Sequence, residues 1–275
     1  MRNTRGALIG GAAILVSAAF FLVPFAFIFL TASMSTDQSS NLSFGLPDHF
    51  LLLDNLKQVI EARDYMILTA FLNSILITVV SVTALVVLGA MVAYVLQRRA
   101  SRWNPVINLV ILAGLIVPPA VVPTIYVLQK THLFKTLEGL MLVEIAYGLP
   151  FCVLLFRAFI STIPRELDQA AMIDGAGPLR IFFRVIFPIL RSVIVTVVVL
   201  QTVFVYNDFQ NPLYFLPGDE HPTVQLTLFN FKSQFITQYN LLFADILLVT
   251  IPPLIMFIFL NRKIVEGMAA GAVKG

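Results

Sequence analysis

Long stretches without a charged residue dominate the pattern of hydrophobic and polar positions along the chain. Three such runs cover residues 6–36, 65–97 and 103–129 and contain 31, 33 and 27 residues. About 20 apolar residues suffice for a helix that crosses the hydrocarbon core of a bilayer. Each run therefore predicts a membrane-spanning helix.

Three further apolar stretches in the second half of the chain each hold one acidic residue. Glu144, Asp208 and Asp245 are these acids. Each stretch is long enough to cross a bilayer if its acid faces other helices or lies near an interface. The pattern predicts an all-α, polytopic membrane protein with six transmembrane helices. The predicted spans are about 8–31, 67–96, 105–129, 138–160, 192–216 and 241–261.

Composition agrees with this pattern and excludes an ordinary soluble domain. Of the 275 residues, 59% are hydrophobic and 12% are charged, and the mean hydropathy is +0.91. Soluble domains are nearer to half apolar and a quarter charged. Disorder is excluded too, because it requires low hydrophobicity and high net charge.

The positive charges predict the orientation of the spans. Lysine and arginine favour cytoplasmic loops, and 13 of the 18 fall on the cytoplasmic side if the N-terminus is placed there. Both termini are therefore expected in the cytoplasm. Residues 33–64 then form an outer loop, with a short helical pattern over 52–62, and residues 161–191 form a cytoplasmic connection.

The cytoplasmic connection has the pattern of two short helices joined by a bend. Pro164 suits a first helical turn, residues 166–173 predict one helix, and Gly175 permits a sharp turn. A second helix is expected over 179–186, ended by Pro188.

Two interpretations of this helix pair follow from its residues alone. The small side chains of Ala170 and Ala171 would let a partner backbone approach closely, which is typical of a docking element. Alternatively, Arg180, Arg184 and Arg191 would meet anionic lipid headgroups and hold an interfacial helix on the membrane.

The same residues resemble a known motif. Gln169-Ala170-Ala171, then Gly175 after three residues, then the ending Val185-Ile186-Phe187-Pro188 are similar to the EAA loop of ABC importer permeases. Gln169 stands where that family usually has Glu. An uncharged glutamine would not form a salt bridge to the ATPase from this position. The resemblance implies that seven residues couple the chain to an ATPase: Gln169, Ala170, Ala171, Asp174, Gly175, Ala176 and Pro188.

Further matches resemble the carbohydrate (maltose-type) importers, specifically their shorter six-helix permease subunit. They are Asn73-Ser74, Ala93-Tyr94 before Arg98-Arg99, Pro118 with Pro123, Asn207-Asp208-Phe209, and the tail from Gly267 to Gly275. The resemblance implies a single permease domain over residues 1–275 with the type I ABC importer fold. It also implies a multi-pass location in the cytoplasmic (inner or plasma) membrane of a prokaryote.

Partners follow from the same resemblance. They are a second homologous permease subunit, two ATPase subunits, an extracytoplasmic substrate-binding protein and membrane lipid; nucleic acid is not expected. The sequence has no Gly-x-x-x-x-Gly-Lys-Ser/Thr phosphate loop. ATP and Mg²⁺ are therefore expected on the ATPase subunits. No cofactor, metal or catalytic residue is expected on this chain, and it is not expected to be an enzyme.

Candidates for a substrate path come from polar groups within the spans. Burying a charge in a bilayer is costly, so Glu144 and Asp208 are functional candidates. Asp208 beside Asn207 would hydrogen-bond sugar hydroxyls, make a helix–helix contact, or lie at the outer membrane interface. Asp245 is expected at the outer interface. The path candidates are Asn73, Tyr126, Glu144, Tyr147, Tyr206, Asn207 and Asp208.

The leading hypothesis is a permease subunit that passes a carbohydrate (a sugar, oligosaccharide or polyol) across the membrane. The alternative is a secondary carrier or channel that acts alone and is driven by an ion gradient through Glu144 and Asp208. The two hypotheses differ in whether transport requires ATP.

Overall fold

The computed structural model describes residues 4–232 and 237–272 of the chain. Within these ranges the backbone is helical, apart from loops and an isolated bridge between Lys232 and Thr237. The predicted all-α class is confirmed for this part of the chain. The outermost residues of both termini, 1–3 and 273–275, lie outside the described residues.

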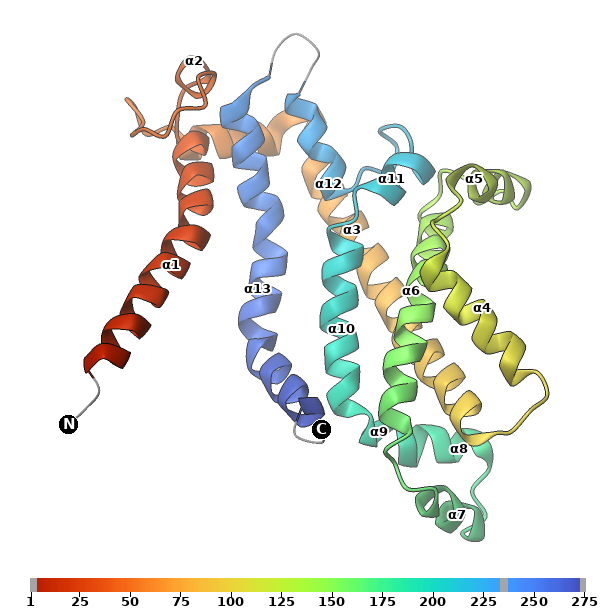
Figure 1. The fold of residues 1–275 in the computed structure, drawn as a ribbon. Coiled ribbons are helices and arrows are strands. Elements are labelled where there is room, and N and C mark those ends of the chain that lie inside the picture. Colours follow the sequence, from red (N-terminus) through yellow and green to blue (C-terminus); the bar gives the residue numbers. More distant parts are fainter. Residues whose placement is uncertain (1–3, 233–236, 273–275) are drawn as a thin grey trace. The chain divides into compact units, whose positions relative to one another are not determined.

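Helices of very different length follow one another along the chain (Figure 1). The longest is α3, and several others form only one or two turns. In chain order they are α1 (Thr4–Ala32), α2 (Thr36–Ser39), α3 (Leu52–Arg98), α4 (Asn104–Ile116), α5 (Val121–Lys130), α6 (Leu137–Ile160), α7 (Glu166–Ile173), α8 (Pro178–Ile181), a π segment (Phe182–Ile186), α9 (Phe187–Ile189), α10 (Arg191–Tyr206), α11 (Gln210–Phe215), α12 (Val224–Thr227), a 3₁₀ turn (Leu228–Phe231) and α13 (Tyr239–Ala272).

Three of these helices are long and apolar enough to cross a membrane: α3, α6 and the Tyr239–Phe259 part of α13. Two pairs of helices, each bent at a short break, give two more spans if each pair is counted as one. One pair is α4 with α5, and the other joins the α8–α9 segment to α10. Helix α1 contributes a shorter apolar stretch, Val16–Ala32.

The predicted third span is broken by prolines. Helices α4 and α5 meet at an angle of 115°, although no charged residue interrupts the run between them. Pro118 and Pro119 follow α4, and Val117 before them is extended at φ −77° and ψ 124°. The residue before a proline disfavours the helical region, and proline lacks the N–H that a helix needs. The expected single helix over 105–129 therefore becomes two.

Helix α3 also changes direction, close to where the outer loop is predicted to enter the membrane. Its residues from Ala62 to Tyr65 have non-helical dihedral angles, and three of them have positive φ. The helical turns before this break correspond to the short helix that the sequence predicts over 52–62.

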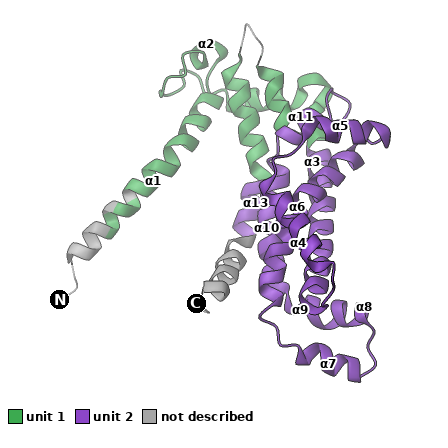
Figure 2. Cartoon of the chain, turned by 45° about the vertical axis from the view of Figure 1, so that its right-hand side comes forward, with its two compact units in different colours: residues 1–70, 224–252 green, residues 71–223, 253–275 purple. Residues whose placement is uncertain are grey.

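The chain divides into two compact units, which Figure 2 colours separately. One comprises residues 1–70 and 224–252, and the other comprises residues 71–223 and 253–275. In the second unit, the hydrophobic core joins α3, α6, the α8–α9 segment and α10. A Cβ atom at Gly89 would lie 2.9 Å from Cys152 Cβ, so α3 and α6 pack at close range there.

A buried hydrogen-bonded cluster organises the first unit. The Asn55 amide donates to the carbonyl oxygens of Ala32 and Met34 at 2.8 and 2.9 Å, and Asn240 donates to Asn55 Oδ1 at 3.0 Å. This cluster ties the end of α1 to the beginnings of α3 and α13. Asp245 is 0% exposed in this unit, and its expected position at the outer interface stays a prediction.

Candidate functional site

Helix α7 and the bend after it form a mostly exposed part of the second unit. The helix runs from Glu166 to Ile173, as the sequence predicts. Gly175 follows with φ +77°, and nothing lies within 4 Å of the position of a Cβ there. The Gly175 N–H donates to the Met172 carbonyl at 3.0 Å and closes the helix. A left-handed residue at this position is the usual device for ending a helix.

The residues expected to couple to an ATPase gather around this bend. Pro188 lies further along the chain, in α9. Exposed members of the set are Gln169, Ala170, Asp174, Gly175 and Pro188, whereas Ala171 and Ala176 are half-buried against the core.

Large apolar side chains stand exposed beside the coupling residues. They belong to Leu167, Met172, Ile173 and Leu179, with Ile173 86% exposed. We call these four residues the loop surface. An exposed apolar surface of this kind indicates contact with another protein or with the membrane.

Pro188 does not end the second helix of the loop, which corrects the sequence prediction. The chain continues from α8 through the π segment into α9, and Pro188 lies within α9. Proline is tolerated there because it occupies the first turn after the π segment, where an N–H has least use. The direction changes only at Leu190, where α10 begins at an angle of 78°.

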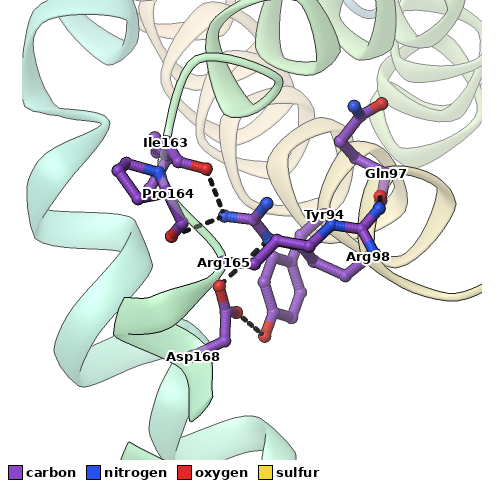
Figure 3. Close-up of polar contacts among 7 residues, drawn as sticks. All are labelled: Tyr94, Gln97, Arg98, Ile163, Pro164, Arg165 and Asp168. Atoms are coloured by element: carbon purple, nitrogen blue, oxygen red, sulfur yellow. Dashed lines mark hydrogen bonds and ion pairs between the residues drawn. The ribbon is translucent and has the colours of Figure 1, made fainter. Parts of the chain in front are cut away.

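A network of polar contacts fixes α7 to the end of α3 (Figure 3). Arg98 Nε lies 3.0 Å from Asp168 Oδ2, and the Tyr94 hydroxyl donates to Asp168 Oδ1 at 2.7 Å. The side chains of Arg98 and Asp168 are only 12% and 7% exposed. Arg98 Nη2 also donates to the Ile163 carbonyl at 2.9 Å. Asp168 thus accepts a hydrogen bond at Oδ1 and makes an ion pair, without a hydrogen bond, at Oδ2.

A second arginine crosses in the opposite direction. Arg165, directly before α7, donates from Nη2 to the Gln97 carbonyl at the end of α3, at 3.2 Å. The last carbonyls of a helix have no partner within it and readily accept such a bond. Sequence reasoning noted Tyr94 and Arg98 only as matches to a family pattern and did not single out Asp168. Its position as an acid in the first turn of a predicted helix was the available signal.

The same unit contains a cavity of about 690 Å³. It lies between α6, α10 and the loop before α11. Four of the seven path candidates line it: Glu144, Tyr147, Asn207 and Asp208. The two acids are the charged residues among the described lining, which includes no lysine, arginine or histidine.

Hydrogen bonds hold the polar groups of this cavity in place. Asn211 donates to Glu144 Oε1 at 3.0 Å. Asp208 Oδ1 accepts from the backbone N–H groups of Gln210 and Asn211 at 2.9 and 3.3 Å. Asp208 therefore caps α11 in addition to lining the cavity.

The other three path candidates lie outside the lining. Tyr126 is 60% exposed, because the bend after α4 carries α5 away from the direction of α4. Tyr206 is 5% exposed. Asn73 donates its side-chain amide to the Pro222 carbonyl at 2.9 Å.

Sequence reasoning missed three polar residues of the lining, Gln201, Gln210 and Asn211. Gln201 is the one carboxamide in α10, which is otherwise rich in valine, and its side chain is 5% exposed. A polar residue inside an apolar span was the signal available. Asn211 stands three residues after Asp208, which places both near one face of a helical turn.

With this geometry established, comparison with known proteins decides the family. Residues 85–268 match the family described as "Binding-protein-dependent transport system inner membrane component". The chain belongs to this family. The permease is 31% identical to the melibiose/raffinose/stachyose import permease MelC of Bacillus subtilis over 268 residues, covering 96% of this chain and 95% of the relative. It is also 31% identical to the trehalose transport permease SugB of Mycobacterium tuberculosis, with 93% of each chain covered.

A solved structure shares the fold of the permease. It is a chain of a bacterial ABC transporter involved in the import of the acidic polysaccharide alginate, with a TM-score of 0.79 and 20% identity, covering 95% of this chain and 98% of that one. The resemblance to ABC importer permeases is thus confirmed. The permease is a transporter component and an integral protein of the cell membrane.

Proposed function

We propose that the permease forms, together with a second homologous permease, the path through which an importer passes a carbohydrate. Relatives named for melibiose, raffinose, stachyose and trehalose support this substrate class. The observation that carries the proposal is the exposed unit of α7, Gly175 and the loop surface, which an ATPase can contact.

The arrangement in the membrane is part of the proposal. Six crossings place both termini and residues 161–191 in the cytoplasm, and residues 33–64 face an extracytoplasmic binding protein. ATP and Mg²⁺ bind to two separate ATPase subunits below the loop. Closure of these subunits displaces α7, and the displacement opens the path outward; hydrolysis reverses it.

The cavity is the proposed section of the path on this subunit. Its hydrogen-bonding side chains are those of Glu144, Tyr147, Gln201, Asn207, Asp208, Gln210 and Asn211. Amide, hydroxyl and carboxylate groups match the hydroxyl groups of a sugar. Its partly apolar wall is typical of a ligand site.

Gly175→Asp tests the coupling part of this function. The purified complex, with every chain that accompanies the tagged permease, is placed in vesicles, and uptake of radiolabelled raffinose and trehalose is measured with and without internal ATP. We expect ATP-driven uptake of at least one sugar. Gly175→Asp should lower it by at least about tenfold, because a charged side chain intrudes where the ATPase subunit packs.

Gly218→Asp is the matched control. Gly218 also has positive φ, +110°, and open space around its Cβ position. It lies between α11 and α12, outside the predicted cytoplasmic connection 161–191. Normal uptake in Gly218→Asp with loss in Gly175→Asp supports coupling through the bend. Sugar uptake by the permease alone, without ATP, would instead support a secondary carrier.

A further inference from the structure

The contacts between α3 and α7 lead to a specific inference about how motion travels inside the permease. We propose that Tyr94, Arg98 and Asp168 form a latch that makes the end of α3 move with α7. The inference rests on the proposed function, in which an ATPase displaces α7. Tyr94 and Arg98 are positioning residues, because they act on the cavity through α3 and do not line it.

The first support is the geometry of Asp168. Its Oδ2 pairs with Arg98 Nε at 3.0 Å, and its Oδ1 accepts from the Tyr94 hydroxyl at 2.7 Å. Two different side chains of α3, one turn apart, thereby hold one carboxylate of α7. Contacts at two points resist rotation of α7 as well as separation from α3.

This ion pair is buried, so its charges attract each other more strongly than those of an exposed pair, and both have lost hydration. The Asp168 side chain is 7% exposed and that of Arg98 is 12% exposed, whereas the surface pair Lys57–Glu61 has exposures of 72% and 48%. Little water screens the buried charges. Removing either charge leaves the other desolvated without its partner, which is the costly case for a buried pair.

The latch is also fixed to the apolar core. The Tyr94 ring lies 5.5 Å from the Phe182 ring, centroid to centroid, and Phe182 is 2% exposed in the π segment. Helix α7 packs against the same segment. Tyr94 therefore touches both the loop carboxylate and the core beneath it.

Helix α3 packs directly against α6, which lines the cavity. A Cβ at Gly148, a lining residue on α6, would lie 2.9 Å from Leu85 Cδ1 on α3. Gly89 on α3 meets Cys152 on α6 at a similarly close range. Closely packed interfaces are hardly compressible and transmit strain, so two helices in such contact move together. A displacement of α3 is thus passed to the cavity wall.

Arg98→Ala and Asp168→Asn test the latch in the complete importer complex in vesicles. We expect both variants to retain the ATPase subunits and their ATP hydrolysis, because the loop surface and Gly175 are untouched. The number of sugar molecules imported per ATP should fall on the order of tenfold. Tyr94→Phe removes one hydroxyl without disturbing the ring and should lower the same ratio by a smaller factor.

Matched controls separate the latch from a general effect of lost charge. Arg99→Ala removes the exposed arginine next to Arg98, and Glu166→Gln removes the exposed acid in the first turn of α7. Both should transport normally. The double variant Arg98→Asp/Asp168→Arg restores an ion pair with reversed charges and should recover part of the coupling, which a purely structural defect would not show.

The outcomes distinguish the latch from the function on which it rests. Absence of ATP-driven uptake in the unaltered complex contradicts the proposed function itself. If the unaltered complex imports sugar and Arg98→Ala imports equally well per ATP, the latch is overturned. It is also overturned if Arg98→Ala or Asp168→Asn releases the ATPase subunits, because the network then serves docking alone.

Discussion

Single glycines decide how closely the helices of the second unit approach one another. A Cβ at Gly89 would lie 2.9 Å from Cys152 Cβ, and one at Gly114 would lie 2.7 Å from Pro150 Cγ. Real Cβ atoms do not come so close, so the helices would have to shift. Small residues permit close packing where the hydrophobic effect between helices is weak, as it is in lipid.

Gly89→Ala is therefore expected to destabilise the permease. The added methyl group meets the Cβ of a core residue that is 0% exposed. Overpacking of this kind costs about 1–3 kcal/mol of unfolding free energy. Thermal unfolding of the purified protein in detergent measures the change as a lower Tm.

Gly11→Ala is the control at this scale. Gly11 lies in α1 with nothing within 4 Å of its Cβ position. Alanine has a higher helix propensity than glycine, so this variant should equal or exceed the unaltered protein in stability. An unchanged Tm for Gly89→Ala would contradict the close packing of α3 on α6.

At the scale of elements, Asp208 illustrates how one residue serves two purposes. Its Oδ1 caps the first N–H groups of α11, and its side chain also lines the cavity. The sequence left open whether Asp208 binds substrate or makes a structural contact. The geometry supplies the structural contact, and the proposed path adds the other role.

Two substitutions separate these roles. Asp208→Asn keeps a capping oxygen and should retain the stability of the protein, whereas Asp208→Ala should lower it by about 1 kcal/mol. If the charge also contributes to the path, both variants should show reduced sugar uptake. Thermal unfolding and vesicle uptake measure the two effects on the same preparations. Equal stability of both variants would contradict the capping role.

Local sequence signals predicted some elements well and failed where tertiary context decides. Helix α7 has the predicted bounds because its proline start and glycine end are local signals. The break between α4 and α5 was missed, although Pro118 and Pro119 were visible, because an unbroken apolar run outweighed them. The Tyr94–Asp168 contact joins residues 74 positions apart, which no local pattern reveals.

At the scale of the whole molecule, the distribution of charge carries the proposed orientation. Few charged residues lie within the apolar helices, and most positive charges belong to the segments assigned to the cytoplasm. The sequence pattern predicted a membrane protein that resembles importer permeases, and the family match confirmed the resemblance. The number of crossings is harder to obtain from sequence, since two candidate spans are bent pairs.

Cysteine labelling tests the orientation. The native thiol, Cys152, is 0% exposed and should give little background. In intact spheroplasts, a membrane-impermeant maleimide should label Ser40→Cys in the outer loop. It should label Ser101→Cys, which is exposed between α3 and α4, only after the membrane is opened, because the positive-inside rule places that connection in the cytoplasm. Labelling of Ser101→Cys in sealed spheroplasts would contradict the orientation.

The two crossing arginines have a consequence for the proposed transport cycle. Arg98 extends from α3 to a carbonyl before α7, and Arg165 extends from the loop to a carbonyl of α3. A one-sided contact could transmit a push and then separate during a pull. A connection made from both sides holds in either direction, so α3 would follow α7 on the power stroke and on the return stroke alike.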